Sequence, residues 1–282
     1  ILARMTPIAD RHPRFISGTK LWHGEIQEAI QTVARVSGAE LIDFHAPLYP
    51  YPYLLPDAIH PNPEGAGILA KTVYGGITGD YGGLKLSELY ADNMVLQRDM
   101  PLDIHGTANA GEQVTVSIAG QKVAAVANNR GEWSVTLQPL RVGTDYTLTI
   151  QAGNQKREFH RVAAGEVWLC SGQSNMAFML NEASTAKEDI PLANDPGFRL
   201  FDMKGRWKTY DGAWPASCLD SLNHLQYFGN TTWEDVSPES AAKFSAIAYY
   251  YGKMLRDSLQ VPVGLICNAV GGSPTESWID RN

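Results

Sequence analysis

The sequence has no long apolar run and no long basic run, and each absence argues against a class of partner. A membrane-spanning helix needs about 18 or more mostly apolar residues in a row, and no run in this chain approaches that length. Aspartate and glutamate outnumber lysine and arginine, 30 to 23, and the formal net charge is −7. We therefore expect no membrane span and no nucleic-acid partner.

Cysteine is also scarce. Cys170, Cys218 and Cys267 form an odd number, so they do not make a complete disulfide framework. Cys170 and Cys267 lie in or beside apolar runs of strand character, where a free thiol acts as a small buried apolar side chain. We predict buried free thiols, which leave the redox compartment of the protein open.

The 282 residues suffice for two ordinary domains or for pieces of three. Residues 1–77 have an α/β pattern. Ile26, Ile30 and Val33 recur at helical spacing and Gly38 stands at a helix stop, which predicts a helix over 24–37. A short strand over 39–44 and a second helix over 64–74 follow. The glycine-rich residues 75–83 predict a linker.

The hydrophobic period then changes from helical spacing to two. Residues 114–120, 122–127, 132–137 and 146–152 alternate in the manner of strands, and turn signals separate them. Short strands at this spacing, without a helical stretch, predict a small all-β sandwich domain over 78–162.

The α/β pattern returns over 163–282. Residues 181–235 are long, polar and rich in Trp and Gly, so they either line a substrate cleft or form a structural insertion. A helix is expected from Ser237 to about residue 259, and a strand over 261–268. The aromatic residues of the polar stretch either stack on sugar rings or pack the insertion itself; they are Trp207, Tyr210, Trp214, Tyr227 and Trp233.

The most informative stretch is 165–176, GEVWLCSGQSNM. A buried-strand run stops at a tight Ser-Gly, and Ser174 follows at the turn. Open α/β sheets bind their ligands at such strand ends, so Ser174 is a candidate nucleophile if a base takes its proton. The stretch resembles the nucleophile block of SGNH-type (GDSL) esterases, in the sialate O-acetylesterase and acetylxylan esterase branch. Residues 261–278 and 91–98 resemble the same branch.

The resemblance implies flavodoxin-like α/β parts on both sides of the β domain, and it assigns site residues. An SGNH enzyme takes its base and the partner of that base from one Asp-x-x-His-Pro block, which this chain has at Asp57 and His60. The resemblance also implies Gly272, with Gly271 beside it, as donors to the oxyanion. Gln173, Asn175 and Glu276 are the implied substrate-binding residues.

The order of these blocks is unusual, because in this family the serine comes first and Asp-x-x-His comes last. Two explanations compete. In the first explanation, residues 1–77 are the C-terminal part of an upstream SGNH domain and residues 163–282 are the N-terminal part of a second one, with the remaining parts outside this chain. Alternatively, the two pieces build one composite site with His60 within about 3 Å of the Ser174 hydroxyl. We favour the first, because the family blocks stop at the chain ends.

The expected function is a serine esterase that removes O-acetyl groups from a sugar, sialic acid or xylan, through an acyl-enzyme and without a metal or cofactor. The alternative is a catalytically inert glycan-binding protein. Asp43 and His45 as a metal pair, and Cys170 as a nucleophile, are weaker candidates. The substrate class alone suggests a periplasmic or secreted protein, and no export signal supports that location.

Overall fold

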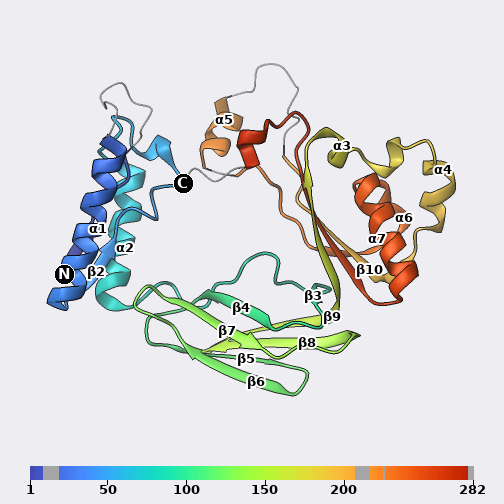
Figure 1. Cartoon of the computed structure of the whole chain (residues 1–282), viewed down its shortest axis with the longest axis horizontal. Helices are drawn as coiled ribbons and strands as arrows, with labels where there is room; N and C mark the ends of the chain where they lie inside the picture. Colours follow the sequence, from blue (N-terminus) through green and yellow to red (C-terminus); the bar gives the residue numbers. More distant parts are fainter. Residues whose placement is uncertain (9–18, 207–215, 225, 279–282) are drawn as a thin grey trace.

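The computed structural model describes residues 1–8, 19–206, 216–224 and 226–278 of the chain. Figure 1 shows three regions in chain order: a pair of helices with a small sheet, a set of long strands, and a mixed region. The expected α/β class is confirmed. None of the helices in these ranges is long and apolar enough to cross a membrane.

The first region holds two short parallel strands and two long helices. Its elements are β1 (Leu2–Arg4), α1 (Thr19–Ser37), β2 (Leu41–Asp43), the 3-10 helix η1 (Pro52–Leu54) and α2 (Pro63–Thr78). α2 begins where the Asn62 side chain accepts a hydrogen bond from the N–H of Gly65, with Pro63 in the first helical position.

The linker expected over 75–83 is wrong in its first part, because α2 continues through Gly75 and Gly76. These glycines allow close packing. A Cβ atom on Gly75 would lie 2.7 Å from the Tyr81 ring, and one on Gly76 would lie 3.1 Å from the Ile42 side chain. The helix ends only at Gly79, whose φ of 75° is the left-handed conformation that glycine adopts readily.

The second region consists of strands: β3 (Val95–Gln97), β4 (Leu102–Thr107), β5 (Gln113–Ile118), β6 (Gln121–Val126), β7 (Glu132–Leu137) and β8 (Gly143–Ala152). β4 and β7 pair antiparallel in one sheet, and β5 lies between β6 and β8 in another. Along β7, Trp133, Val135 and Leu137 are buried and alternate with exposed residues. The buried side chains of both sheets share one apolar cluster.

The strand β9 (Gln155–Gly172) is 18 residues long and runs from the second region into the third. Its first part pairs antiparallel with β8, and its last part pairs in parallel with β12 (Val263–Ala269). The domain boundary expected between residues 162 and 163 therefore falls inside one strand. At Gly165 a Cβ atom would lie 1.9 Å from the Pro262 carbonyl oxygen, so only glycine fits where the strand passes this turn.

The third region surrounds three parallel neighbours, β9, β12 and β10, with β11 antiparallel at the edge. Its other elements are α3 (Ser174–Ala177), η2 (Leu180–Glu182), α4 (Ala186–Asp189), η3 (Ile190–Leu192), β10 (Asp195–Asp202), α5 (Ala216–Asn223), β11 (Trp233–Val236), α6 (Pro238–Ala242), α7 (Ala246–Leu259) and η4 (Thr275–Trp278). The polar stretch 181–235 thus supplies a sheet strand, since residues 197–201 of β10 are all buried.

The single helix expected from Ser237 to about residue 259 is in fact two helices, α6 and α7. The chain breaks between them, and Ser245 starts α7 with a side-chain cap. The break frees backbone groups for another segment, because the Phe244 carbonyl accepts the N–H of Leu180. The interruption thus anchors the chain that follows α3.

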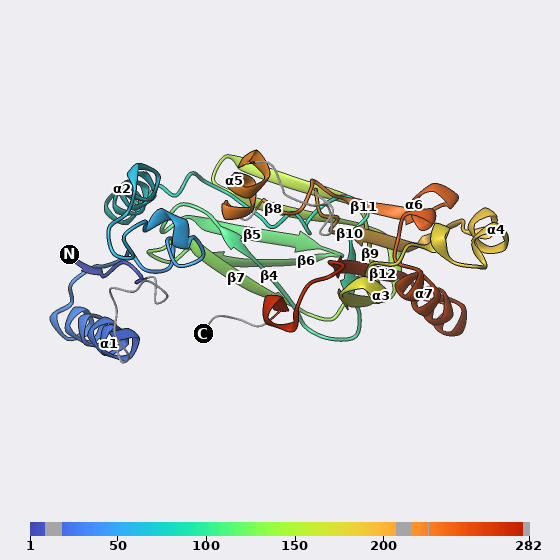
Figure 2. The ribbon, with the colours of Figure 1, turned by 90° about the horizontal axis from the view of Figure 1, so that it is seen from above.

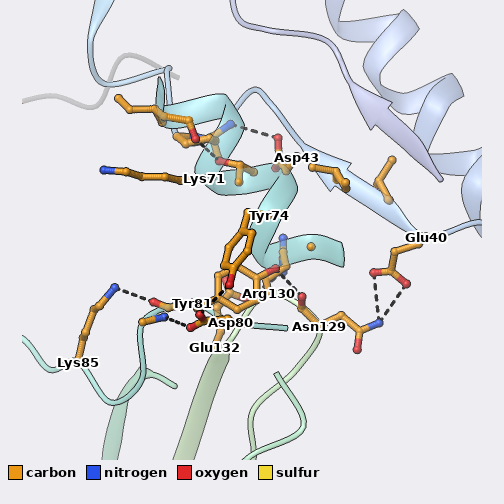
Figure 3. Close-up of a pocket in the computed structure, with 18 residues that line it drawn as sticks. Glu40, Asp43, Lys71, Tyr74, Asp80, Tyr81, Lys85, Asn129, Arg130 and Glu132 are labelled. Carbon is orange, nitrogen blue, oxygen red and sulfur yellow. Dashed lines mark hydrogen bonds and ion pairs between the residues drawn. The ribbon is translucent and has the colours of Figure 1, made fainter. Parts of the chain in front are cut away.

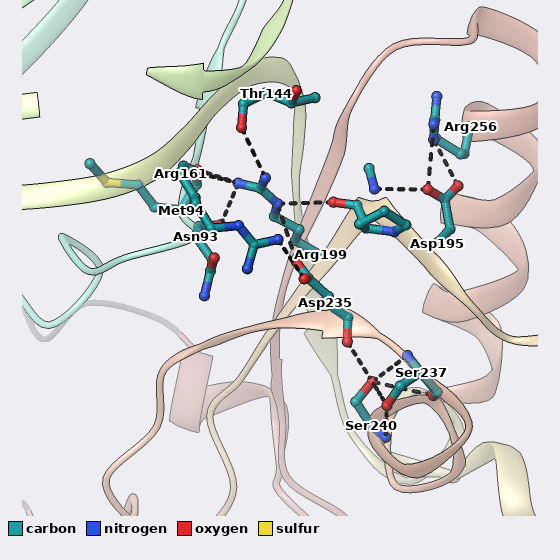
Figure 4. A network of polar contacts seen from close by, with 12 residues as sticks. Asn93, Met94, Thr144, Arg161, Asp195, Arg199, Asp235, Ser237, Ser240 and Arg256 are labelled. Atoms are coloured by element: carbon teal, nitrogen blue, oxygen red, sulfur yellow. Dashed lines mark hydrogen bonds and ion pairs between the residues drawn. The ribbon is translucent and has the colours of Figure 1, made fainter. Parts of the chain in front are cut away.

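Arg199, in β10, joins the second and third regions. Its side chain is only 1% exposed. The guanidinium donates to the backbone carbonyls of Asn93 at 3.0 Å, Thr144 at 3.3 Å and Arg161, and one nitrogen lies 3.5 Å from the Asp235 carboxylate (Figure 4). One charged side chain of the α/β sheet therefore holds three separate backbone segments of the strand region.

We predict that Arg199→Gln lowers the free energy of unfolding by about 3 kcal/mol or more, because it leaves buried acceptors without their donor. Arg161→Gln is the matched control. Arg161 pairs with the same Asp235 at 2.7 Å but its side chain is 50% exposed, so its loss should stay below about 1 kcal/mol. Denaturant unfolding of both variants measures the difference, and equal losses would contradict the role given to Arg199.

Candidate active site

Three strands bring candidate residues to one edge of the sheet in the third region. Because β9, β12 and β10 are parallel neighbours, their carboxyl ends meet at the same edge. Ser174 opens α3 two residues after β9 ends, Gly271 follows β12 by two residues, and Asp202 is the last residue of β10. The N–H of Val270 donates to the Gly172 carbonyl at 3.0 Å, which fixes the loop after β12 beside the end of β9.

The Ser174 hydroxyl is held by its neighbour. It donates to Oε1 of Gln173 at 2.8 Å, and the same oxygen accepts the backbone N–H of Ser174 at 2.8 Å. Gln173 is therefore the cap of α3 and fixes the serine side chain. Within the described residues no histidine is hydrogen-bonded to this hydroxyl. Asn175 follows in α3 and is exposed.

Ser174 and Gly271 line one open pocket of about 440 Å³. Charged side chains also line the pocket, and none of them was predicted as a site residue from the sequence. One of them is Asp202. Burial raises the pKa of Asp202, and Lys204, with Nζ at 2.9 Å from its carboxylate, acts against that shift. The available signal was a carboxylate at the end of a buried apolar run, Arg199-Leu-Phe-Asp202, inside a stretch that otherwise resembled an insertion.

Gly272 and Glu276 lie in the loop after β12. Gly272 has a φ of 77°, so the turn itself requires glycine there. Gly272 is not among the described residues that line the Ser174 pocket, and Glu276, in η4, is exposed. The loop is closed by Ser273, whose hydroxyl donates to the Val270 carbonyl at 2.8 Å and accepts the indole N–H of Trp278 at 3.0 Å.

Asp57 and His60 form a pair in the first region. Nδ1 of His60 lies 2.7 Å from Oδ2 of Asp57, while Oδ1 of Asp57 accepts the backbone N–H groups of His60 and Ile59 at 2.7 and 3.1 Å. These bonds, above all the one from the His60 ring, hold the pKa of Asp57 well below its usual range. The carboxylate thus orients the imidazole, and the His60 side chain is 74% exposed.

The structure does not bring this pair to Ser174. In the described ranges no hydrogen bond or ion pair joins His60 to Ser174, and neither Asp57 nor His60 lines the Ser174 pocket. The loop between η1 and α2 and the helix α3 lie in different parts of the molecule in both views (Figures 1 and 2). The two candidate sets therefore occupy two separate places.

A larger pocket, of about 850 Å³, lies where the first region meets the strand region (Figure 3). β2, α2, residues 80–85 and the turn at 129–132 line it, and the Asn129 amide bridges to the Glu40 carboxylate at 3.3 Å. Asp43, the weaker metal candidate, is part of its lining, but none of the residues predicted for the serine chemistry or for substrate binding lies among the described residues there.

The comparisons with known proteins point to one group of enzymes. No family model matches the chain. It is 32% identical to the sialate O-acetylesterase of Rattus norvegicus over 213 residues, and 29% identical to that of Homo sapiens over 212. The chain is a relative of the sialate O-acetylesterases. These matches cover 68% and 70% of the chain but only 37% and 39% of the two relatives, so the chain spans little more than a third of their length.

A solved structure agrees with this relationship. A carbohydrate acetylesterase from Xanthomonas citri is 31% identical, with a TM-score of 0.59, over 70% of this chain and 42% of that one. The resemblance expected from the sequence to SGNH-type carbohydrate esterases is thereby confirmed.

The weaker candidates in this relative of the acetylesterases have structural explanations. The Asp43 carboxylate pairs with Arg4 at 2.8 Å and caps the backbone N–H groups of His45 and Ala46. No group of three or more His, Cys, Asp or Glu in the described residues could hold a metal ion. Trp233 is buried against Phe201 and is core.

One of the remaining aromatic residues predicted either to stack on sugar rings or to pack the insertion lies at the Ser174 pocket. Tyr227 lines the Ser174 pocket. Trp207, Tyr210 and Trp214 lie outside the described residues.

His224 connects the third region to the helix that follows the Asp57–His60 loop. Its Nε2 lies 3.0 Å from Oε1 of Glu64, at the start of α2, and its ring centroid lies 4.8 Å from that of Tyr53. Its Nδ1 lies 2.7 Å from the Asp220 carbonyl oxygen. The bond to the Asp220 carbonyl, the largest effect, raises the pKa of His224, and the Glu64 carboxylate adds to it.

This contact should weaken as pH rises. Because the pKa of His224 is higher in the folded protein than its unfolded value of about 6.5, its contribution is fully present below that value and is lost as pH rises through the raised folded pKa. We expect the thermal midpoint of the parent protein to exceed that of His224→Gln at pH 5.5 and the gap to close at alkaline pH. A gap that widens with pH would contradict the contact.

The burial of two cysteines predicts that their thiols are unreactive in the folded protein. Cys170 and Cys267 are buried and free, and burial raises the pKa of both, that of Cys267 to about 12. Because the thiolate is the reactive form, we predict that neither reacts with a thiol reagent until the protein is unfolded. Rapid labelling of Cys170 in the native protein, located by peptide mass spectrometry, would revive it as a candidate nucleophile.

Proposed function

We propose that this chain is part of a carboxylic ester hydrolase that removes O-acetyl groups from a carbohydrate, with Ser174 as nucleophile. The observation that carries the proposal is the position of Ser174. It stands at the carboxyl edge of a parallel sheet, on a turn held by Gln173, and faces an open pocket. The names of the relatives, a sialate O-acetylesterase and a carbohydrate acetylesterase, supply the substrate class.

The chemistry follows from the serine. The Ser174 oxygen attacks the acetyl carbonyl carbon while a base takes its proton, and the N–H of Gly272, next to Gly271, stabilises the oxyanion. The intermediate collapses, the sugar oxygen leaves with the proton from the base, and acetyl-serine remains. Water, activated by the same base, then releases acetate and restores the hydroxyl. Gln173, Asn175 and Glu276 contact or position the substrate.

The base for Ser174 lies outside this chain in our proposal. Residues 1–77 are the C-terminal part of an upstream SGNH domain in which Asp57 orients His60, and residues 163–282 are the N-terminal part of a second SGNH domain. Between them, residues 78–162 form a β-sandwich domain. The preformed Asp57–His60 pair belongs to the loop between η1 and α2, which lies away from α3 (Figure 1), and this supports two sites rather than one. Acetylated glycans outside the cell make a periplasmic or secreted location the natural one.

The test measures acetate release by the full-length protein from acetylated sugars and p-nitrophenyl acetate, with Ser174→Ala, His60→Ala and the double variant. Two sites predict losses that add up to the whole activity. A single triad predicts that the double variant is no slower than either single one. At its own site each change should cost about a thousandfold or more in kcat.

Ser184→Ala is the matched control, because Ser184 is exposed and lies outside the Ser174 pocket. It should keep the activity of the parent. Unchanged acetate release in Ser174→Ala, once the His60-dependent part is subtracted, would contradict the serine mechanism. Glycan binding without any acetate release by the parent protein would favour the inert glycan-binding alternative.

A further inference from the structure

The lining of the Ser174 pocket combines an aromatic residue with an ion pair, and this inference, which rests on the proposed function, concerns what they bind. Phe178 is part of the lining and is 43% exposed although it is aromatic. The lining also includes Asp202 and Lys204, with 2.9 Å between Nζ and the carboxylate. An exposed aromatic ring and a charged pair in one pocket are the combination that binds the C–H face and the hydroxyls of a sugar.

The Asp202 carboxylate can accept more hydrogen bonds than it receives from the described side chains. A carboxylate can accept about four hydrogen bonds, and within the described residues Lys204 is the only side chain bonded to it. The Asp202 side chain is 22% exposed, so it is largely withdrawn from water yet borders the pocket. Its strand partner in β12 is Cys267, four residues before Gly271, so the carboxylate lies at the same sheet edge as Ser174.

The same pair borders a second pocket. Asp202 and Lys204 also line a cavity of about 680 Å³, whose other side chains include Thr231, Thr232 and Glu234 of the segment leading into β11 and of β11 itself. The lining also includes Ser237, Ser240, Asp235 and Glu239, so it offers several hydroxyl and carboxylate groups. The ion pair, together with Lys243, therefore belongs to the lining of both pockets, and Ser174 belongs to the lining of one of them.

We infer that the substrate is an acetylated oligosaccharide that crosses the Asp202–Lys204 pair. The acetylated ring lies in the Ser174 pocket against Phe178, and the linked neighbouring ring lies in the pocket beside Glu234. Asp202 accepts hydrogen bonds from sugar hydroxyls and Lys204 donates to them, so the pair determines specificity and takes no part in bond cleavage.

The experiment compares three substrates in the full-length protein: p-nitrophenyl acetate, an acetylated monosaccharide and an acetylated oligosaccharide of the same sugar. Only the rate lost in Ser174→Ala is counted. Asp202→Asn should lower kcat/KM for both sugar esters, relative to p-nitrophenyl acetate, by about tenfold or more, the cost of a hydrogen bond to a charged group. Glu234→Gln should lower that ratio for the oligosaccharide ester alone, and Glu188→Gln, outside both pockets, should change neither ratio.

The results that would overturn the inference differ from the result that would contradict the proposed function. An equal loss on all three substrates in Asp202→Asn, with an unchanged melting curve, would place Asp202 in the chemistry and overturn the inference. So would an oligosaccharide ratio that Glu234→Gln leaves intact. If Asp202→Asn does not fold, Lys204→Gln tests the same pair by the same ratios. A Ser174→Ala protein that hydrolyses p-nitrophenyl acetate at the parent rate would instead contradict the proposed function.

Discussion

The buried guanidinium of Arg199 sets the relation between the strand region and the α/β sheet. A charge withdrawn from water is tolerated only when its donors are satisfied, and here the acceptors are backbone carbonyls of Asn93, Thr144 and Arg161. Because the acceptors are backbone carbonyls, the three segments have little freedom to move relative to Arg199: a shift of any of them would leave a buried donor unpaired. The register of β10, and with it the position of Asp202 at the strand end, depends on this fit.

The continuous strand β9 transmits the same constraint to the nucleophile. Its first half belongs to the antiparallel sheet of the second region and its second half to the parallel sheet that ends at Ser174. A glycine inside a strand usually marks a break or a close backbone approach. At Gly165 the second explanation holds, since the Pro262 carbonyl leaves no space for a side chain. The boundary expected between residues 162 and 163 rested on the change from period-two to α/β patterning, and that change occurs within one continuous strand.

Local patterns predicted local structure well. Helical spacing and the Gly38 stop located the end of α1, although α1 begins at Thr19 and not at residue 24, and the second helix was expected from residue 64, one residue after its observed start. Period-two alternation located the strands β5 to β8, and a strand followed by a tight turn located Ser174. The break between α6 and α7 was missed because Leu180, far away in the sequence, takes the backbone acceptor that an unbroken helix would use. β10 and Asp202 were missed for a related reason: the apolar run around Arg199 contains a charge, and only the tertiary fold buries it.

The site residues show the same division between local and distant contacts. Asp57 and His60 are three residues apart, and Gln173 is adjacent to Ser174, so each arrangement forms from its own segment without help from the other region. A motif match therefore predicts such geometry correctly without information about the rest of the fold. Acyl transfer needs more, because the nucleophile and its base must come together across the fold. Here the long-range contacts of β9 and Arg199 fix where Ser174 lies, and the loop that carries Asp57 and His60 lies in a different part of the molecule (Figure 1). The preformed halves are thus evidence for the chemistry of each segment, while the distant contacts determine which segments can share a site.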